Sequence, residues 1–341
     1  MSREKRKIDH IRHALSHSRE PQNHFDDIEI VHQSISGLSW DDLRLDIEVG
    51  ELSLSSPLFV NAMTGGGGKK TEDINRQLAE VAAETGIAMA VGSQMSALKN
   101  PEEKRSYEVV RKSNPKGVIF ANLGSEASLE HANQAVDMLE ADALQIHLNT
   151  LQELIMPEGD RNFSARLNNI EKIAARLPVP VIVKEVGYGM SMESAALLKE
   201  AGVRYIDVAG RGGTNFSKVE NQRRENPLHV FENWGIPTPV SLLEVQCTYP
   251  GSHIFASGGI RHGLDGAKAL ILGAEMFGMA GGLLKVLVTS GQEALIERIE
   301  SIHHELKVTM MLLHADKPHA LAGKAYILTG KTKEWMAQRS H

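Results

Sequence analysis

The stretch 253–282, HIFASGGIRHGLDGAKALILGAEMFGMAGG, decides the fold class of this 341-residue chain. It holds two short apolar runs, 253–256 and 275–279, on either side of a helical pattern at 264–272. A pair of glycines closely follows each run. Continuous apolar runs are typical of parallel strands buried on both faces, and such strands need a crossover between them. We therefore predict two neighbouring parallel strands, each ending in a glycine turn.

The same strand–helix unit repeats along the rest of the chain. Six further apolar runs come before this stretch, at 58–62, 87–91, 118–121, 143–148, 181–186 and 205–209. Helical patterns follow many of them, at 71–84, 129–139, 167–177 and 191–201. Eight such units predict a closed barrel or a doubly wound sheet. Nearly every run ends in a polar or glycine-rich tip, whereas an open sheet gathers its ligand loops at one switch point. We therefore predict an α/β fold of the (β/α)8 TIM-barrel type.

The ends of the chain extend this barrel. Residues 1–57 predict an N-terminal arm and a hairpin, 45–49 with 52–54, that closes the barrel floor. Residues 58–282 make the barrel, and 283–341 make a C-terminal tail that is mostly one long helix. An apolar stripe marks this helix, formed by Ile296, Ile299, Ile302, Leu306 and Met310. No low-complexity linker divides the chain, so we predict a single domain over 1–341.

Composition excludes several classes of function. The net charge of −6 and the isoelectric point near 6.2 argue against a non-specific binder of nucleic acid or of membrane surfaces. Cys247 is the one cysteine, so no internal disulfide forms, as is usual in a reducing compartment. The charged N-terminus lacks the apolar run of a signal peptide, and no segment approaches the roughly 20 apolar residues that span a bilayer. We expect a cytoplasmic protein without nucleic-acid or membrane partners.

The glycine turns after the last two strands are the most specific sign of function. Active sites of such barrels lie at the carboxyl ends of the strands. Successive backbone N–H groups in glycine turns can hold a phosphate together with a helix N-terminus. One such turn alone is more simply a tight connection. Two turns on consecutive strands, 257–261 and 280–282, predict a phosphate site.

Lys184 ends an apolar run, where its charge is costly to desolvate unless an anion compensates it. Three interpretations stay open. The lysine faces the N1–C2 carbonyl edge of a flavin, it forms a Schiff base, or it extends its amine to solvent at the rim. Short polar residues at neighbouring tips, Ser93, Asn122 and Thr214, suit a flat polar heterocycle.

Three further features allow a functional and a structural interpretation. His147 is either a core residue whose hydrogen bonds are made within the protein or a catalytic residue. Glu153 is either a Mg²⁺ ligand beside a diphosphate or a carboxylate favoured in a first helical turn. The basic segment with Arg6, Lys7 and His10 is either solvated or a clamp for an anion at the barrel mouth.

Several motifs together point to one known family. They are Arg6-Lys7 with His10, Met63-Thr64-Gly65-Gly66, Gly92-Ser93-Gln94, 145–149 with Gln152-Glu153, Val183-Lys184-Glu185, 212–216 and 256–259. In this order and spacing the chain resembles the type 2 isopentenyl-diphosphate delta-isomerases, in the form found in Gram-positive bacteria. The resemblance extends from the basic arm to the tail around Trp335.

The resemblance implies interconversion of isopentenyl and dimethylallyl diphosphates in isoprenoid biosynthesis, with FMN, Mg²⁺ and NADPH as reductant, and no net redox change. It implies a homo-oligomer, a tetramer or an octamer. Residues implied to bind FMN are Ala62, Met63, Thr64, Ser93, Asn122, Lys184, Thr214, Ser257, Gly258, Gly259, Ile260, Arg261, Ala280 and Gly281. Residues implied to bind the substrate are Arg6, Lys7, His10, Ser93, Gln94, Asn149 and Gln152. His147 and Gln152 are the implied catalytic residues, and Glu153 the implied Mg²⁺ ligand. Met95 departs from the family, because many relatives have arginine there.

Three alternatives compete with this assignment. An FMN-dependent 2-hydroxy-acid oxidase needs a catalytic histidine and arginine after the sixth strand, and 211–214 holds no histidine. An enzyme like inosine-monophosphate dehydrogenase needs a loop cysteine, whereas Cys247 falls in a helical pattern. A catalytically silent barrel that binds a phosphorylated ligand stays open.

Overall fold

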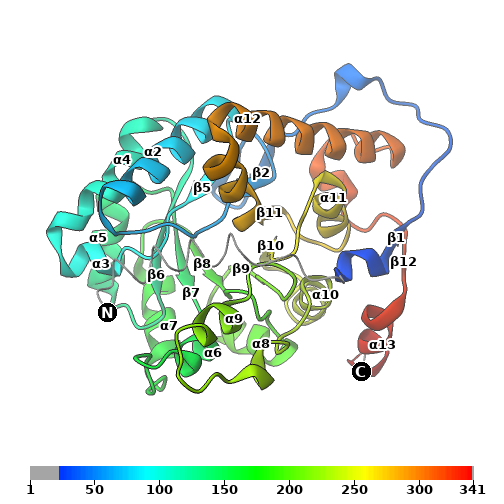
Figure 1. The fold of residues 1–341 in the computed structure, drawn as a ribbon. Helices are drawn as coiled ribbons and strands as arrows, with labels where there is room; N and C mark the ends of the chain where they lie inside the picture. Colours follow the sequence, from blue (N-terminus) through cyan, green and yellow to red (C-terminus); the bar gives the residue numbers. More distant parts are fainter. Residues whose placement is uncertain (1–22, 340–341) are drawn as a thin grey trace.

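The computed structural model describes residues 23–339, in which eight parallel strands close into a barrel (Figure 1). The spatial order is β10-β11-β4-β5-β6-β7-β8-β9, so chain neighbours are also neighbours in the barrel. The predicted (β/α)8 barrel is confirmed, and each of the eight predicted runs overlaps one strand. The strands are β4 Leu58–Val60, β5 Ala88–Ala90, β6 Ile119–Gly124, β7 Ala143–His147, β8 Val181–Lys184, β9 Tyr205–Asp207, β10 His253–Ser257 and β11 Met276–Met279.

Helices connect successive strands on the outside of the barrel (Figure 1). The five helical patterns predicted between strands are all confirmed. The helices are α2 Gly68–Thr85, α3 Met95–Lys99, α4 Arg105–Ser113, α5 Leu129–Leu139, α6 Thr150–Ile155, α7 Arg166–Arg176, α8 Met192–Glu200, α9 Phe216–Asn221, α10 Thr238–Thr248 and α11 Gly263–Ile271. Short 3-10 helices are η1 His24–Asp27, η2 Trp40–Asp42, η3 Pro101–Lys104, η4 His229–Phe231 and η5 Pro318–Leu321.

Local sequence explains where these helices begin and which face they bury. Ser128 caps α5 by accepting a hydrogen bond from the N–H of His131, whose ring accepts one from the N–H of Ser128. On α2, the apolar side chains Ile74, Leu78 and Val81 recur at helical spacing and are buried in the main core cluster. The helices therefore present an apolar stripe to the barrel.

The lower interior of the barrel is apolar and is closed by a hairpin. Strands β2 Ile47–Val49 and β3 Leu52–Leu54 pair antiparallel. Their apolar side chains belong to one cluster with inward-facing residues of the barrel strands, among them Phe59, Phe120 and Phe255. The predicted floor hairpin is therefore confirmed.

Two residues further along several strands, the inward positions become polar. Because side chains alternate across a strand, residues two apart face the same side. Asn61 follows Phe59 in this way, and Asp207 follows Tyr205. The resulting polar layer lies at the carboxyl ends of the strands. Its members, all buried, are Asn61, Asn122, Lys184, Asp207 and Ser257.

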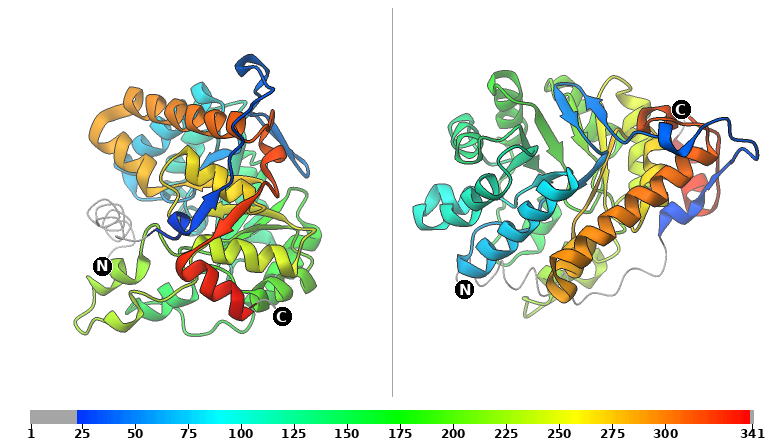
Figure 2. Two further views of the ribbon diagram at one scale, coloured as in Figure 1. Left: turned by 90° about the vertical axis from the view of Figure 1, so that its right-hand side faces the viewer. Right: turned by 90° about the horizontal axis from the view of Figure 1, so that it is seen from above.

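The C-terminal tail differs from the prediction of mostly one long helix. Helix α12 Gly281–Leu312 buries most of the predicted stripe, but it is bent at Gly291, whose φ of 89° and ψ of −177° are not helical. After α12, strand β12 Tyr326–Leu328 pairs antiparallel with β1 Ile28–Ile30, and α13 Gly330–Arg339 follows. The blue and red segments lie side by side in Figure 2. Strand pairing between residues about 300 positions apart leaves no local sequence signal.

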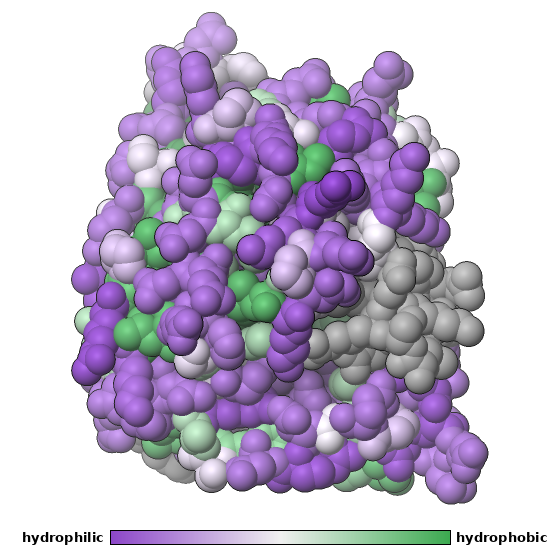
Figure 3. All heavy atoms as spheres, turned by 90° about the vertical axis from the view of Figure 1, so that its left-hand side faces the viewer, coloured by the Kyte–Doolittle hydropathy of each residue, from purple (hydrophilic) through white to green (hydrophobic). Residues whose placement is uncertain are grey.

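Among residues 23–339, no helix is both long and apolar enough to cross a bilayer. On the face drawn in Figure 3, apolar side chains lie in small groups among polar ones. Scattered apolar groups of this kind are normal on folded proteins.

Asp27 holds the tail against the N-terminal segment. Its carboxylate accepts hydrogen bonds from the N–H (3.0 Å) and the hydroxyl (2.8 Å) of Thr332 in the first turn of α13. We predict that Asp27→Ala weakens docking of α13 by about 1 kcal/mol, the usual effect of losing a helix cap. Amide hydrogen exchange of the α13 residues should become faster. Asp27→Asn, which keeps an acceptor oxygen, should change exchange less. Equal exchange in Asp27→Ala and the wild type would show that the cap does not hold the tail.

Candidate active site

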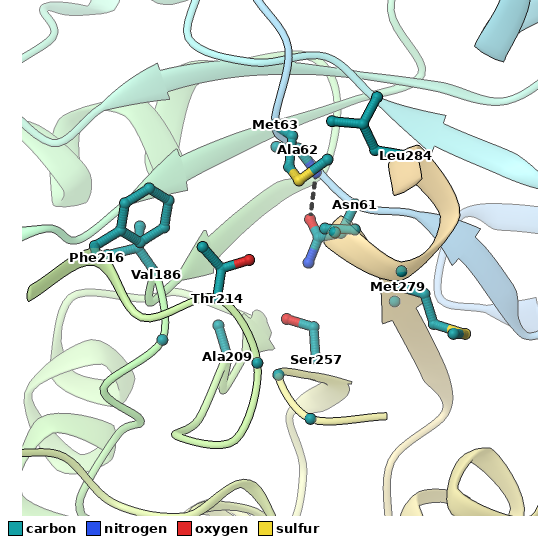
Figure 4. Close-up of a pocket in the computed structure, with 18 of the residues that line it drawn as sticks. Asn61, Ala62, Met63, Val186, Ala209, Thr214, Phe216, Ser257, Met279 and Leu284 are labelled. Carbon is teal, nitrogen blue, oxygen red and sulfur yellow. Dashed lines mark hydrogen bonds between the residues drawn. The ribbon is translucent and has the colours of Figure 1, made fainter. Parts of the chain in front are cut away.

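A cavity of about 920 Å³ opens at the carboxyl ends of the barrel strands, and the ends of all eight strands contribute to its wall. Figure 4 shows Thr214 and Phe216 on one side of the cavity, Met63 and Leu284 on the other, and Ser257 below them in this view. In a barrel of this type the active site lies at this end. The cavity is therefore the candidate active site.

A buried carboxylate, Asp207, is at the centre of the polar layer under the cavity. Its Oδ2 accepts a hydrogen bond from the amide of Asn61 (2.8 Å), and its Oδ1 accepts one from the hydroxyl of Ser257 (2.8 Å). Asn61 in turn accepts a hydrogen bond from the amide of Gln145 (3.2 Å). Because β4, β7 and β9 are not neighbours, these bonds cross the barrel interior. The layer is thus fixed from several sides.

Lys184 carries the positive charge of this layer. It is buried, and its Nζ donates a hydrogen bond to the backbone carbonyl of Glu185 (2.6 Å). Burial lowers the pKa of Lys184, while the charges of Asp207 and Glu185 oppose that shift. Burial likewise raises the pKa of Asp207, and Lys184 opposes it. The two charges compensate each other at a site where either alone would be costly.

Glu185 points away from the cavity. Its carboxylate accepts hydrogen bonds from the backbone N–H groups of Val186, Gly187 and Tyr188 in the turn after β8. Burial raises the pKa of Glu185 to about 7. This side chain fixes the turn that follows Lys184.

His147 faces the cavity as a neutral ring. Its Nδ1 lies 3.0 Å from Oδ1 of Asn122, and an amide oxygen only accepts, so Nδ1–H is the donor. Nε2 then keeps its lone pair. Burial, followed by the charges of Lys184 and Arg166, lowers the pKa of His147 to about 3. The ring can therefore accept a hydrogen bond at neutral pH.

The glycine turn after β10 depends on the tip of β9. Gly258 has φ +93°, and a Cβ atom there would lie 2.1 Å from the carbonyl oxygen of Gly210. Gly259 has φ +81°, and its Cβ would lie 3.0 Å from the carbonyl carbon of Gly212. Glycine is needed here because two backbones meet, which is a different reason from contact with a ligand.

The side chain of Arg261 is held by two carboxylates. Its Nε donates to Asp265 (2.7 Å) and its Nη2 to Asp26 (2.5 Å), and these hydrogen bonds raise its pKa. Asn23 also donates a hydrogen bond, to the carbonyl of Gly259. The segment that contains Asn23 and Asp26 therefore braces the turn after β10.

The structure brings most of the predicted site residues together around the cavity. It is lined by Ala62, Met63, Ser93, Asn122, His147, Gln152, Lys184, Thr214, Ser257, Gly258, Gly259, Ile260, Arg261, Ala280 and Gly281. Four predicted residues do not line it, namely Thr64, Gln94, Asn149 and Glu153. Arg6, Lys7 and His10 lie outside the described residues.

Thr64 and Gln94 lie behind the cavity wall. The hydroxyl of Thr64 donates to the side chain of Asn75, and both residues are buried. Gln94 is fully buried, with its amide donating to the carbonyl of Ala135 (2.9 Å) and its oxygen accepting from the N–H of Asn122 (3.0 Å). Both residues lie in the loops that follow β4 and β5, and their hydrogen bonds turn the two side chains toward α2 and α5. These contacts position the wall rather than a ligand.

Asn149 and Glu153 form a small network beside the cavity. The carboxylate of Glu153 accepts from the amide of Asn149 (2.9 Å) and from the N–H of Asp160 (2.8 Å). Gln152 lines the cavity itself and donates to Oε1 of Glu220 (3.0 Å). Within residues 23–339 no group of three or more histidine, cysteine, aspartate or glutamate side chains could hold a metal ion.

Several residues that build the site carry no motif in the sequence. Asp207 lies within a mainly apolar run, and only its place two residues after Tyr205 marks it as inward-facing. Glu220 and Lys218 come from α9, within a stretch where no motif had been recognised. Lys285 follows the last glycine turn and also lines the cavity.

Comparison with known proteins decides the family. Isopentenyl-diphosphate delta-isomerases of Geobacillus sp. and Bacillus licheniformis are 53% and 54% identical to this chain, over 99% of it and 97% of each relative. The chain belongs to the isopentenyl-diphosphate delta-isomerase family. Residues 101–327 also match the FMN-dependent dehydrogenase family. The resemblance stated from the motifs is confirmed.

Solved structures of more distant proteins share the fold. A lactate oxidase from Pediococcus acidilactici is 19% identical, with a TM-score of 0.70 over 96% of this chain and 93% of the oxidase. A mandelate oxidase is 17% identical, with a TM-score of 0.64 over 96% and 93% of the two chains. At such identities the likeness concerns the fold alone.

The left-handed turn at Gly258 leads to a prediction about stability. Gly258→Ala should lower the free energy of unfolding by more than about 2 kcal/mol, since both a left-handed backbone and a clash oppose the methyl group. Gly251→Ala is the matched control, because a Cβ atom on Gly251 would meet no other atom within 4 Å and its φ is not left-handed. Urea unfolding of both variants measures the difference. Equal stabilities would refute the close approach of the two strand tips.

The burial of His147 leads to a prediction about its charge. Because its pKa is lowered to about 3, the ring should stay neutral at every pH at which an ordinary histidine, with a pKa near 6.5, gains its proton. The ring-proton signal in NMR spectra, assigned with His147→Gln, should not shift between about pH 5 and 8. A signal that shifts with a midpoint near 6.5 would show that the ring is not buried as described.

Proposed function

We propose that this chain interconverts isopentenyl and dimethylallyl diphosphates, with reduced FMN bound in the cavity. The observation that carries the proposal is the cavity itself, which combines two glycine turns with Lys184 and a set of short polar side chains. About half of all residues are shared with curated isopentenyl-diphosphate delta-isomerases, which supports the same substrate.

The residues around the cavity fit FMN. The turns after β10 and β11 present backbone N–H groups to a phosphate, and α12 begins there. Lys184 would donate to the N1–C2 carbonyl edge of the ring, and Ser93, Asn122, Thr214 and Ser257 offer polar groups to the rest. Reduced FMN, when bound, supplies acid–base chemistry to the alkene without net redox change. NADPH is the proposed reductant.

His147 and Gln152 would orient the substrate at the cavity wall. The neutral ring of His147 offers Nε2 as an acceptor, since Nδ1–H is occupied by Asn122. Glu220 accepts a hydrogen bond from the amide nitrogen of Gln152, which leaves the amide oxygen to accept one from the substrate. Both groups are thus prepared before a ligand arrives, which favours positioning of a reacting alkene.

The diphosphate side of the substrate is assigned to other residues. Glu153 would bind Mg²⁺ beside the diphosphate, with Asn149 adjoining it, and Arg6, Lys7 and His10 would contact the phosphate oxygens. Thr64 and Gln94, which point away from the cavity, would act by supporting it. Met95 carries no charge, so the cation that the family resemblance places there is absent from this position. Its side chain is buried and does not line the cavity.

Three broader expectations belong to the same proposal. We propose one FMN-binding domain over 1–341, a homo-oligomer of four or eight chains, and a cytoplasmic location. The single cysteine, Cys247, is exposed on α10 and unpaired among the described residues, as is usual in a reducing compartment.

An anaerobic assay tests the function directly. Protein loaded with FMN should convert isopentenyl diphosphate to its isomer after reduction with dithionite, and should be inactive with oxidised FMN. Addition of a 2-hydroxy acid to the oxidised protein should leave the flavin spectrum unchanged, because the tip after β9 lacks the histidine base that oxidation requires. Reduction by the hydroxy acid would favour an oxidase. Tight FMN binding without either reaction would favour a catalytically silent barrel.

Glu153→Gln tests the Mg²⁺ assignment. Loss of one anionic ligand should lower the isomerase rate by about tenfold or more and weaken the dependence on Mg²⁺, while FMN stays bound. Glu130→Gln is the control, because Glu130 is also a first-turn carboxylate, on α5, and lies outside the cavity. If both variants keep the wild-type rate and Mg²⁺ dependence, Glu153 only supports the start of its helix.

A further inference from the structure

The charge of the cavity wall is opposite to that of the protein. The chain has 43 aspartates and glutamates against 37 lysines and arginines. Among residues 23–339, those that line the cavity include the cations Lys184, Lys218, Arg261 and Lys285, and no aspartate or glutamate. A cavity with only positive side chains concentrates anions, even in an acidic protein.

Two of these cations are already compensated. Arg261 forms ion pairs with Asp26 and Asp265. The charge of Lys184 is compensated by that of Asp207 in the polar layer under the cavity. Lys218 and Lys285 form no ion pair with any described residue. Their charges are therefore available to a ligand.

Lys218 extends from one wall of the cavity. It is half-buried on α9, four residues after Thr214, and its backbone N–H donates to the side chain of Asn215 (3.0 Å). The carboxylate of Glu232, with which Lys218 interacts electrostatically, takes its hydrogen bonds from Asn221 and His229 instead. Side chains of a helix lean toward its N-terminus, so Lys218 leans toward Thr214.

Lys285 extends from the opposite wall. It is exposed on α12, one turn after Gly281, and it leans toward the glycine turn for the same reason. The two walls meet at this level, because a Cβ atom on Gly281 would lie 3.2 Å from the hydroxyl oxygen of Thr214. Figure 4 shows Thr214 and Leu284, the neighbour of Lys285, on the two sides of the cavity. The two cations, which form no ion pair among residues 23–339, thus flank one contact between the walls.

We propose that Lys218 and Lys285 form a clamp for a phosphate group at the contact between Thr214 and Gly281. The hydroxyl of Thr214 and the first N–H groups of α12 supply the neutral donors, and the two ammonium groups supply the charge. The chemistry recognised is a phosphate dianion. Its source is the cofactor phosphate or the substrate diphosphate, and this choice of ligands rests on the proposed function.

Binding measurements on Lys218→Gln and Lys285→Gln test the clamp. The probes are FMN, riboflavin and, for the FMN-loaded protein, inorganic pyrophosphate. Each variant should weaken binding of one phosphate probe by about tenfold, the usual effect of losing a charged hydrogen bond, with riboflavin affinity unchanged. Lys172→Gln removes the same charge from the exposed face of α7, outside the cavity, and is the control.

The outcomes separate the two sources. Weaker FMN binding assigns the clamp to the cofactor phosphate, and weaker pyrophosphate binding with unchanged FMN binding assigns it to the substrate diphosphate. Unchanged affinities for both, an equal loss for riboflavin, or losses that Lys172→Gln reproduces would overturn the clamp. Since only binding is measured, a wild-type protein without isomerase turnover counts against the proposed function and leaves this result standing.

Discussion

The electrostatic interaction between Asp207 and Lys184, which are cross-strand neighbours on β9 and β8, is the constraint on which the rest of the site depends. Both side chains are buried, and each charge would be costly alone. Asp207 also receives hydrogen bonds from Asn61 and Ser257, so the same carboxylate fixes the inner ends of β4 and β10. Through Gln145 and Asn122 the network reaches His147 on the far side. One buried carboxylate therefore orders the polar layer under the cavity and compensates the charge of Lys184, which faces the proposed cofactor.

Above this polar layer, the charged side chains that line the cavity are cations, which favours the binding of anions. Among the described residues, acidic side chains lie below or behind it, as Asp207 and Asp265 do, while the glycine turns and several lysines line the cavity. The glycine turn after β10 is held in place by its close approach to the tip of β9 and by the segment that carries Asp26. That segment is in turn fixed to the C-terminal tail through Asp27 and the β1–β12 pair. Parts of the chain far apart in sequence thus jointly support the proposed phosphate site.

The fold and the outline of the site could be predicted because they rest on local patterns. The eight apolar runs and the two glycine turns are contiguous in the sequence, and the motifs at the strand ends were enough to indicate the family. The direction of single side chains could not be predicted in the same way. Thr64 and Gln94 follow β4 and β5 as expected, yet they face α2 and α5, because in these loops no regular alternation fixes which side chains turn inward. Asp207 lies within an apolar run, which gives no local sign of its role. Lys218 lines the cavity only because α9 places it there, and no sequence motif predicts that placement.

Unfolding of Asp207→Asn by urea at neutral pH tests the buried pair most directly. The substitution keeps the shape of the side chain and removes its charge, so Lys184 would be left buried without a counter-charge. We predict a loss of about 3 kcal/mol or more in the free energy of unfolding, the usual result of leaving a buried charge uncompensated. A stability equal to that of the wild type would contradict the pairing, because it would mean that Asp207 is already neutral and that Lys184 does not depend on its charge.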